Sequence, residues 1–408
     1  MVEGVEVEIA RIGARGDGVA MRDGEAVYVP FGLPGERWRL EGDAGAMRVV
    51  DGPARAEPVC RHFLRCGGCV AQHMPDDVYR EWKRGLVVEA FRHRGIEADV
   101  APVVVVAAGS RRRAVLGVVR RGGEVTLGFR EEGQHKLVDL AECPVLDPAI
   151  VAAFPGLRTL ARRVLKEGET GRLVVTRLDH GLDVSLDAER RDFSADERAE
   201  LARQAREMGL LRLIVGREPI ASAGPATVTI GGVAIAVEPS IFLQAVPEAE
   251  RTIADLCVSA LPKRTKTVVD LFSGVGTLTF PLARRAQVTA FDSDKRAIAA
   301  LSNAVRHAQG LKPVTARVRD LFREPLSARE LQGFDAAVFD PPRAGAADQA
   351  ERLAASKVPV VIAVSCNPAT LARDARTLID GGYTMGQVTP VDQFLYSAHV
   401  EAVAVFRR

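Results

Sequence analysis

Aromatic residues are scarce in this chain, at 5% of its 408 residues, and 55 basic and 53 acidic side chains leave a net charge of only +2. A charge so close to zero gives no overall attraction to nucleic acid, so an anionic partner has to be bound by local groups of basic residues. Apolar runs such as Ala101–Ala108 and Val358–Val364 fall far short of the about 18 to 20 residues that span a bilayer. The amino terminus lacks the apolar stretch of a secretory signal, so we expect a cytoplasmic protein without a membrane partner.

Cysteine is also rare, with six residues in the chain. Six thiols are too few for a disulfide scaffold, and in a reducing compartment their spacing matters more than their number. Four of them have a spacing typical of metal ligands: Cys60, Cys66, Cys69 and Cys143. This pattern predicts a metal site, and from spacing alone zinc and an iron–sulfur cluster are both open, because both accept four thiolates. Cys257 has no partner in the sequence and is expected in the core.

The length and the texture of the chain predict three domains. Residues 1–56 alternate apolar and polar positions between glycine-rich turns, which is typical of a small OB-like β-barrel. Residues 57–237 mix valine-rich strands with helices and predict an α+β domain. Residues 238–408 alternate buried strands with helices and predict a Rossmann-like α/β domain around a parallel sheet. The expected helices include 75–95, 148–166 and 194–208, and the expected strands of the last domain are 267–272, 287–291, 314–318, 334–339 and 358–364.

Residues 270–277, with the sequence DLFSGVGT, predict a strand that enters a glycine turn before a helix. Asp292 ends the next expected strand, where a carboxylate can accept hydrogen bonds from both hydroxyls of a ribose. Asp320 and Asp340 follow the ends of later strands. Thr279 stands where the dinucleotide fingerprint has its third glycine, and the turn has no P-loop lysine. S-adenosylmethionine therefore fits better than NAD, because it carries a ribose but no pyrophosphate.

Two further residues are candidates for catalysis. Cys366 lies in the run 365–374, SCNPATLARD, between a strand and a helix that begins with proline. The helix dipole predicts a lowered thiol pKa there, although a small buried hydrophobic residue is an equally open reading. Glu401 lies in the final expected strand, and a glutamate in a strand more often faces solvent than a substrate.

Taken together, these motifs resemble the RNA uracil-C5 methyltransferase family, in particular the members with a TRAM domain and an iron–sulfur cluster that modify 23S ribosomal RNA. The resemblance covers nearly the whole chain and is most specific in the run 365–374. The run 62–73, HFLRCGGCVAQH, is similar to the family's cluster loop, and the turn Leu33–Glu36 is similar to part of a TRAM domain. The resemblance therefore implies an RNA-binding barrel, a central domain that carries the cluster, and a methyltransferase domain.

The resemblance also implies roles for individual residues. It places a [4Fe-4S] cluster on Cys60, Cys66, Cys69 and Cys143. It places S-adenosylmethionine against Gln244, Phe272, Thr277, Asp292, Asp320 and Asp340. Cys366 becomes the nucleophile that adds to carbon 6 of uracil, and Glu401 becomes the base that removes the proton from carbon 5, so that 5-methyluridine forms through a covalent adduct. The chain departs from the family's usual residues at Thr277, Asp292, Asp320 and Leu395.

RNA is the expected partner, with ribosomal RNA favoured and transfer RNA open. The expected phosphate contacts are the arginines Arg111, Arg112, Arg113, Arg120, Arg121 and Arg130, together with the barrel. Alternatives are an RNA-binding assembly factor without catalysis, an adenine amino-methyltransferase and an RNA cytosine-C5 methyltransferase. The second is disfavoured because Arg343 follows Asp340-Pro341-Pro342 where an aromatic residue is usual, and the third because no second cysteine lies there. A monomer without an obligate protein partner is the default.

Overall fold

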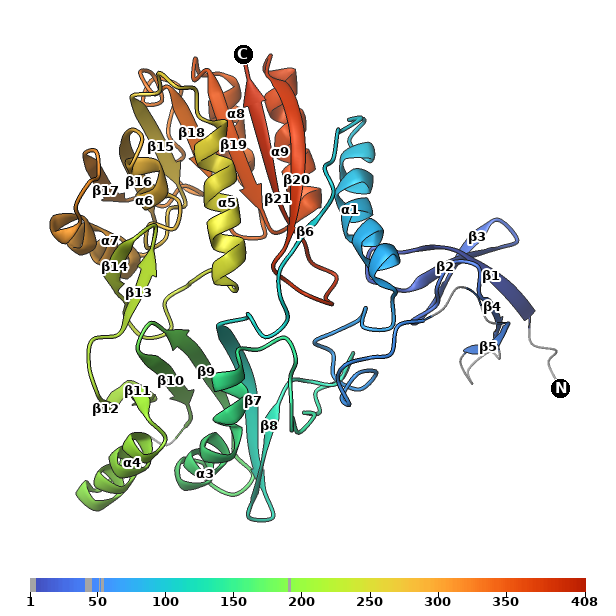
Figure 1. Cartoon of the computed structure of the whole chain (residues 1–408), viewed down its shortest axis with the longest axis vertical. Coiled ribbons are helices and arrows are strands. Elements are labelled where there is room, and N and C mark those ends of the chain that lie inside the picture. The colour runs from blue at the N-terminus through green and yellow to red at the C-terminus, as the bar shows by residue number, and fades with distance from the viewer. Residues whose placement is uncertain (1–4, 41–45, 51, 53–54, 190–191) are drawn as a thin grey trace.

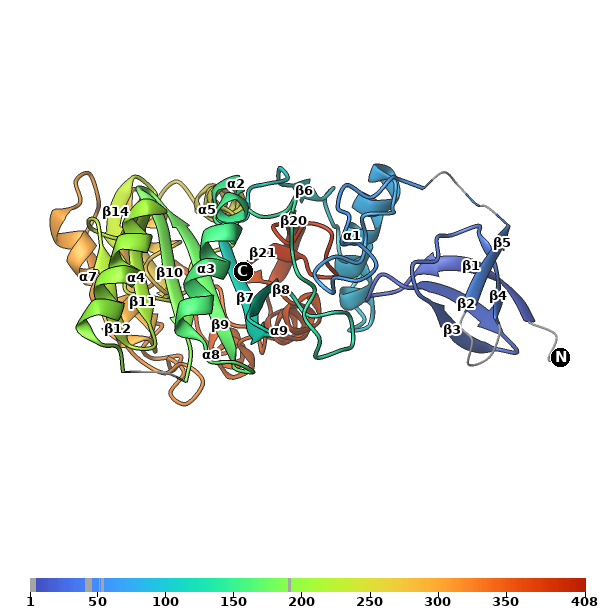
Figure 2. The ribbon, with the colours of Figure 1, turned by 90° about the horizontal axis from the view of Figure 1, so that it is seen from below.

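The computed structural model describes the chain except for residues 1–4, 41–45, 51, 53–54 and 190–191. Figure 1 shows a C-terminal sheet flanked by helices, a central sheet below it, and a small N-terminal sheet to one side. In the view turned by 90°, the N-terminal sheet lies at one end of the molecule, with helix α1 between it and the rest (Figure 2). No helix among the described residues is both long enough and apolar enough to span a membrane.

The N-terminal part is an antiparallel sheet of five strands in the order β3-β2-β1-β4-β5. Its strands are β1 (Val5–Ile12), β2 (Gly18–Arg22), β3 (Glu25–Val29), β4 (Arg37–Leu40) and β5 (Ala46–Val50). Alternate residues such as Val7 and Ile9 face a small core, as their spacing predicts. Strands β3 and β5 are its edges in the described residues, so closure into a barrel stays a prediction, and parts of the predicted domain 1–56 lie outside those residues.

The buried carboxylate of Glu36 connects the turn before β4 with Arg55, which follows β5 in the chain. Glu36 is fully buried and accepts two hydrogen bonds of 2.7 Å from Arg55, one of 2.8 Å from the Leu33 amide and one of 3.0 Å from the Trp38 indole. Arg48 adds a bond of 3.2 Å. Burial alone raises the pKa of Glu36, but these donors and the Arg55 charge outweigh it and lower the pKa to about 2. The carboxylate is therefore charged and structural.

The central part is a sheet of six strands in the order β12-β11-β10-β9-β7-β8. Its strands are β7 (Arg113–Arg121), β8 (Glu124–Gly128), β9 (Thr170–Leu178), β10 (Gly181–Asp187), β11 (Leu210–Val215) and β12 (Glu218–Ser222). Helices α2 (Pro148–Ala152), α3 (Phe154–Val164) and α4 (Ala195–Glu207) accompany it, and all three lie where the sequence predicts helices. Ser194 and Glu197 form a capping box that begins α4, which crosses between the parallel strands β10 and β11.

The C-terminal part is a sheet of eight strands in the order β17-β16-β15-β18-β19-β21-β20-β6. Its strands are β6 (Val104–Val105), β15 (Thr267–Leu271), β16 (Gln287–Asp292), β17 (Val314–Val318), β18 (Ala336–Phe339), β19 (Val360–Ser365), β20 (Thr384–Asp392) and β21 (Glu401–Arg407). The five strands from β15 to β19 are parallel, which confirms the predicted α/β sheet, and β21 runs antiparallel to β19. The direction in which successive strands are added to the sheet reverses between β15 and β18. Open α/β sheets bind ligands at this position.

Helices cover both faces of this sheet (Figure 1). They are α1 (Asp76–Arg92), α5 (Pro247–Ala260), α6 (Thr279–Ala283), α7 (Lys295–His307), α8 (Ala347–Ala354) and α9 (Pro368–Asp380). Helices α1, α8 and α9 share one core and α5 and α6 another, while α7 packs against the hairpin β13 (Thr227–Ile230) and β14 (Val233–Ala236). Cys257 is fully buried in α5, as predicted.

Residues from the predicted central domain complete this sheet. Strand β6 pairs in parallel with β20, and α1 packs against α9. Trp82 of α1 donates a hydrogen bond of 2.9 Å from its indole to the Gly13 carbonyl, which ties the N-terminal sheet to α1. Residues 76–105, which belong to the predicted central domain, thus contact the C-terminal sheet. The expected division of the chain at residue 237 stays a prediction.

Candidate active site

A cavity of about 790 Å³ lies where the carboxyl ends of the parallel strands face the central sheet and the cysteine-rich loop. Every residue that the sequence predicts for the site, except Asp320, lines this one cavity. The cavity size suits a ligand of the dimensions of a nucleoside or larger. The structure therefore brings the predicted catalytic, cofactor and cysteine residues together from segments far apart in the chain.

The glycine turn after β15 forms one wall. Phe272, Gly274 and Gly276 have φ angles of 63°, 54° and 103°, a region that favours glycine and is strained for Phe272. Both oxygens of Asp292 accept backbone amides at 2.8 Å, one from Gly274 and one from Asp294. The carboxylate is thus held at the cavity wall, and each oxygen keeps a free acceptor site for a hydroxyl group.

Thr279, which replaces the third glycine of the dinucleotide pattern, has a structural explanation. Its side chain is fully buried and its hydroxyl donates a hydrogen bond of 2.5 Å to Asp270. The other oxygen of Asp270 has no hydrogen-bond partner in the described residues, and burial raises the pKa of this carboxyl to about 7. A third glycine in this turn would leave the buried Asp270 without its donor.

Asp320 is the predicted cofactor residue that the structure does not bring to the cavity. Its carboxylate instead accepts the backbone amides of Phe322 at 3.0 Å and Arg323 at 3.3 Å, which caps the turn after β17. The neighbouring Phe322 does line the cavity, and its ring lies 5.3 Å from that of Phe272. Asp320 therefore supports the cavity wall through the turn that carries Phe322.

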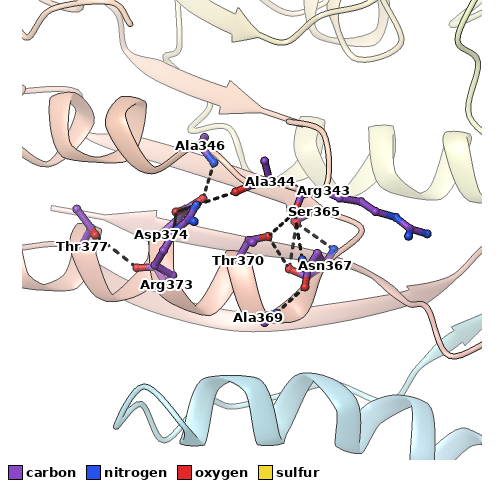
Figure 3. Close-up of polar contacts among 10 residues, drawn as sticks. All are labelled: Arg343, Ala344, Ala346, Ser365, Asn367, Ala369, Thr370, Arg373, Asp374 and Thr377. Carbon is purple, nitrogen blue, oxygen red and sulfur yellow. Dashed lines mark hydrogen bonds and ion pairs between the residues drawn. The ribbon is translucent and has the colours of Figure 1, made fainter. Parts of the chain in front are cut away.

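The residues around Cys366 form a hydrogen-bonded frame, which explains why the run 365–374 has its composition (Figure 3). Ser365 accepts the Asn367 amide at 3.1 Å and donates to the Asn367 carbonyl at 3.2 Å, so the chain bends tightly around Cys366. Asn367 caps α9 by accepting the Ala369 amide at 3.1 Å, and Pro368 begins the helix. The side-chain amide of Asn367 also donates to the Arg343 carbonyl at 3.1 Å.

The same run holds the loop that follows β18. Asp374 is buried, accepts the Ala346 amide at 2.8 Å and pairs with Arg373, which donates to the Ala344 carbonyl at 3.1 Å (Figure 3). Gly345 approaches this pair so closely that a Cβ there would lie 2.5 Å from the Arg373 guanidinium. The strand ends that carry Asp340 and Cys366 are therefore fixed to one another.

Cys366 is half-buried, and its expected low pKa is wrong for the free protein. Burial and the negative charges of Glu401 and Asp340 raise the pKa of the thiol to about 11, against a smaller lowering by Arg343. The reason is that the helix dipole acts on an exposed terminus, whereas this thiol shares a recessed cavity with two carboxylates. The thiol therefore carries its proton at neutral pH until a ligand changes its surroundings.

Glu401 is the first residue of β21 and is 2% exposed, so the solvent-facing reading of this glutamate is wrong. Strand β21 pairs along both edges, with β19 and β20, and its alternate residues pack into the cores on the two faces of the sheet. Gln393 donates from Nε2 to Glu401 Oε2 at 2.6 Å and to Gln244 Oε1 at 2.9 Å. Gln244 in turn donates from Nε2 to Asp340 Oδ2 at 2.8 Å. Two amides thus connect two carboxylates in one chain of hydrogen bonds.

The two carboxylates at the ends of this chain affect each other's ionisation. Burial and the nearby charge of Asp340 raise the pKa of Glu401, against a lowering by the Gln393 bond. Loss of water around Asp340 raises its pKa as well, against a lowering by Gln244. Glu401 is therefore a carboxylate that can hold a proton near neutral pH, which is what a general base needs.

The four predicted metal-ligand cysteines, Cys60, Cys66, Cys69 and Cys143, line the same cavity and carry free thiols. The backbone amide of Arg61 donates to Glu142 at 2.8 Å and His62 accepts the Ala141 amide at 3.0 Å, so residue 143 is brought to the loop that carries the other three. Burial and the other three thiols raise the pKa of Cys69 to about 12, against a lowering by its hydrogen bond with Gln72.

A single metal ion does not fit these thiols as they stand. In the described residues no group of three or more histidine, cysteine, aspartate or glutamate side chains could hold a metal ion. Tetrahedral zinc needs four ligand atoms at about 2 Å from one centre. The thiols therefore face one cavity and act on each other electrostatically, but they do not converge on one point.

Three of the arginines expected to bind RNA phosphates have other partners. Arg112 is buried and forms an ion pair of 2.6 Å with Glu250 of α5, so this part of the RNA prediction is wrong. Arg111 is mostly buried against the Phe394 ring, at 6.0 Å from its centre. Arg120 donates to two backbone carbonyls next to α3. Exposed cations remain at Arg121 and Arg130, for which RNA contact stays a prediction.

Sequence reasoning missed two groups that act on the site. Gln393, which bonds Glu401, belongs to no motif, and no sequence signal marks it. Lys83 is fully buried in α1 and donates to Asp392 at 2.7 Å, to the Phe394 carbonyl at 3.2 Å and to the His399 carbonyl at 2.5 Å. A lysine among the apolar positions of an amphipathic helix is the one signal that could have identified it.

The chain is similar to known RNA methyltransferases. A family model described as tRNA (uracil-5-)-methyltransferase matches residues 235–408. Uncharacterized RNA methyltransferases of Brucella suis biovar 1 and Caulobacter vibrioides are 44% and 43% identical; each match covers 99% of this chain, and 98% and 100% of those proteins. The 23S rRNA (uracil(1939)-C(5))-methyltransferase RlmD of Halomonas elongata is 34% identical over 98% of this chain and 88% of its own length.

Among solved structures, the tRNA (uracil-54, C5)-methyltransferase of Pyrococcus abyssi in complex with S-adenosyl-L-homocysteine has a TM-score of 0.77. The match covers 98% of this chain and 99% of that one, at 24% sequence identity. This likeness shows that the two chains share their fold over nearly their whole length.

Proposed function

This chain belongs to the RNA uracil-C5 methyltransferase family, and we propose that it forms 5-methyluridine at one uridine of 23S ribosomal RNA through a covalent bond from Cys366 to carbon 6 of the base. The family fixes the enzyme class, an S-adenosylmethionine-dependent RNA methyltransferase. The observation that carries the proposal is that Cys366 and Glu401 line one cavity with the glycine turn and Asp292. A nucleophile, a base and a site for a nucleoside cofactor are thus within reach of a single flipped uracil.

Uracil needs activation because its carbon 5 is a poor nucleophile. Addition of the Cys366 sulfur to carbon 6 places electron density on carbon 5, which can then accept a methyl group. S-adenosylmethionine, when bound, supplies that methyl group as an electrophile. The thiol has to lose its proton first, and Arg343, whose charge lowers the Cys366 pKa, favours the thiolate at this point.

Glu401 completes the reaction in this proposal. After methylation carbon 5 carries both a proton and the methyl group, and removal of the proton restores the double bond and expels the Cys366 sulfur. Glu401 lines the same cavity as Cys366 and is shielded from water, so it can take this proton. The target uridine has to leave its stack to enter the cavity, which costs least in a single-stranded loop.

The cofactor site follows from the strand ends. Asp292 has both oxygens anchored by amides and keeps acceptor sites for the two ribose hydroxyls. Gln244, Phe272, Thr277 and Asp340 line the cavity beside it, in keeping with the proposed contacts to S-adenosylmethionine. Asp320 contributes through the turn that carries Phe322, rather than by a direct contact.

For the cysteines we propose a [4Fe-4S] cluster. A cluster binds each of its four cysteines to a different iron and so accepts thiols that do not converge on one ion. Cys60, Cys66, Cys69 and Cys143 line one cavity, and this supports the proposal that they hold such a cluster together. Anaerobic purification should give a protein with iron and sulfide in equal amounts and broad visible absorption. Stoichiometric zinc without sulfide would overturn the cluster.

Ribosomal RNA is the proposed substrate because a relative at 34% identity, the Halomonas enzyme, is named as a 23S rRNA methyltransferase. Transfer RNA is the second candidate, favoured by the name of the matching family model. Mapping 5-methyluridine in both RNAs from cells with and without the gene separates the two. Loss of one 5-methyluridine from 23S rRNA is expected, and a loss confined to transfer RNA would reverse the assignment.

The covalent step is tested with RNA that contains 5-fluorouridine, because fluorine cannot be removed as a proton and the adduct is trapped. The native protein with S-adenosylmethionine should form a protein–RNA species that survives denaturing electrophoresis, and Cys366→Ala should abolish it while RNA binding remains. The buried Cys257→Ala variant is the matched control and should still form the adduct. No adduct with the native protein would leave the RNA-binding assembly factor as the better reading.

A further inference from the structure

We propose that Gln393 is a positioning residue for Glu401, which holds one oxygen of the base by a hydrogen bond so that the other is directed at carbon 5 of the substrate. This inference rests on the proposed function and adds to it a residue that no sequence motif contains. Gln393 is 2% exposed and does not line the cavity, so it acts through Glu401 rather than on the substrate.

Gln393 donates hydrogen bonds to two neighbouring side-chain oxygens. Its Nε2 has two hydrogens, and both are used, toward Glu401 Oε2 at 2.6 Å and Gln244 Oε1 at 2.9 Å. The orientation of the Gln244 amide is fixed in turn, because its Nε2 donates to the Asp340 carboxylate. An ionised carboxylate can only accept hydrogen bonds, so the amide of Gln393 has to present its nitrogen to Glu401.

This orientation has a cost that the structure makes visible. The Gln393 Oε1 atom is buried and has no hydrogen-bond partner in the described residues. Buried acceptors are satisfied in most proteins, and one left without a partner destabilises the fold. Gln393 therefore directs its nitrogen at Glu401 and leaves its own carbonyl oxygen without a partner in the described residues. This is the orientation expected of a side chain that positions the base.

The backbone on both sides of Gln393 is fixed by α1. Asp392 accepts Lys83 at 2.7 Å and also the Tyr79 hydroxyl, and the Phe394 carbonyl accepts Lys83 at 3.2 Å. These bonds restrain the residues that flank Gln393 in the chain. With the residues on both sides held by two buried side chains of α1, the Gln393 side chain can define the position of a base to within the tolerance that proton transfer requires.

The role predicts which step suffers when the bond is lost. In the release step the carbon 5 proton moves to Glu401, the electrons of that C–H bond form the carbon 5 to carbon 6 double bond, and the electrons of the C–S bond leave with Cys366. Addition and methyl transfer precede this step. A displaced Glu401 therefore slows release of the methylated RNA and leaves its formation intact.

The test replaces the amide with a side chain of the same length. We expect Gln393→Met to transfer one methyl group per protein to an unmodified 23S rRNA transcript within about 3-fold of the native rate. Its steady-state turnover should fall about 10-fold to 100-fold, with a methylated, Cys366-linked RNA species accumulating on denaturing gels. The acid limb of its pH–turnover profile should move to higher pH, because a donor to the ionised base is gone.

Gln349→Met is the matched control, since Gln349 is 1% exposed, bonds the Leu326 backbone at 2.9 Å and 3.2 Å, and does not line the cavity. It should show native adduct lifetime and a native pH profile. If Gln393→Met is unfolded in circular dichroism, Gln393→Asn carries the same test, because its amide is one methylene too short to reach both acceptors.

Native adduct lifetime and a native acid limb in a folded Gln393 variant would overturn the inference. Equal losses in adduct formation and turnover would also overturn it, because a purely structural residue slows every step alike. Adduct formation by the native protein with 5-fluorouridine RNA distinguishes failure of this inference from failure of the proposed function. If the native protein forms no adduct with this RNA, the proposed function itself fails. If it forms the adduct, and Gln393 variants release methylated RNA normally from a substrate with ordinary uridine, only the role of Gln393 is removed.

Discussion

Glu36 in the N-terminal sheet and Glu401 in the C-terminal sheet are both at most 2% exposed, yet their surroundings have opposite effects. Glu36 accepts hydrogen bonds from two arginines, an indole and a backbone amide, and its pKa falls to about 2. Glu401 accepts one from a neutral amide and has a second carboxylate nearby, and its pKa rises. Burial raises the pKa of both groups, but only Glu36 has charged donors that outweigh it, and these donors make it structural rather than reactive.

The contrast between Glu36 and Glu401 shows how one chain can use a buried glutamate either for stability or for catalysis. A carboxylate with several charged donors holds segments together and has no reason to exchange a proton. A carboxylate with a single neutral donor is costly to bury as an anion and so is ready to accept a proton. The two glutamates can therefore be exchanged for glutamine as a matched pair, with opposite expected outcomes.

The largest effect is expected for Glu401→Gln. Without the base, turnover on RNA should fall by about 10²-fold to 10⁴-fold, the range that general base catalysis supplies. The covalent RNA adduct should accumulate, because addition precedes proton removal. The unfolding free energy should stay level or rise, since a neutral amide is easier to bury than a carboxylate. A variant that unfolds more readily and turns over normally would end the comparison.

Glu36→Gln should reverse this pattern. It removes the buried anion with which Arg55 and Arg48 pair, and breaking a buried ion pair on one side costs about 3–5 kcal/mol. Denaturant unfolding should show this loss, while methyl transfer per folded molecule stays within about 2-fold. Because the folded pKa is about 2 and the ordinary pKa of a glutamate is 4.5, the stabilisation is complete above pH 4.5 and is lost as the pH falls toward 2. A loss independent of pH in this window would contradict the assignment.

The same pair predicts opposite slopes with pH near neutrality. The raised pKa of Glu401 means that the folded protein keeps a proton that the unfolded chain loses above about pH 4.5, so its contribution to stability decreases as the pH rises. Turnover should increase over the same range, because the base acts when ionised. Native and Glu401→Gln proteins compared across pH 5 to 9 should differ in both slopes, and parallel profiles would show that Glu401 is not the titrating group.

The smallest effect concerns a third carboxylate, which tests how far the comparison extends. Asp292 is half-buried and each of its oxygens accepts a backbone amide, so Asp292→Asn should lose one of these two bonds and one acceptor for a ribose hydroxyl. Binding of S-adenosylmethionine measured by calorimetry should weaken by about 10-fold, as expected for one charged hydrogen bond. Asp320→Asn, outside the cavity lining, is the control and should stay within about 3-fold.

Much of the C-terminal sheet could be predicted from the sequence, because parallel strands are buried on both faces and read as continuous apolar runs. The strands expected at 267–272 and 358–364 are found at Thr267–Leu271 and Val360–Ser365. Since ligand sites lie at the ends of such strands, this was also enough to bring Asp292, Asp340 and Cys366 to one cavity.

What the sequence could not show depends on packing between distant segments. The burial of Glu401 follows from the pairing of β21 with both β19 and β20, and no local pattern encodes which strands become neighbours. Arg112 looks like part of a basic surface patch until α5 presents Glu250, 138 positions along the chain. Gln393 reaches Glu401 only because residues 393–400 fold back between two paired strands.

Helix α1 and strand β6 join a sheet whose other members are made much later. During synthesis residues 76–105 leave the ribosome before β20, their edge partner, and at about 5–20 residues per second the wait is tens of seconds. The apolar face of α1, with Phe91 fully buried in the finished protein, has no partner during that time. Folding of this chain is therefore completed when its last strands and helix α9 pack against a segment made near its beginning. A nascent chain stalled before residue 368 presents to chaperones a helix whose partner α9 has not yet been made.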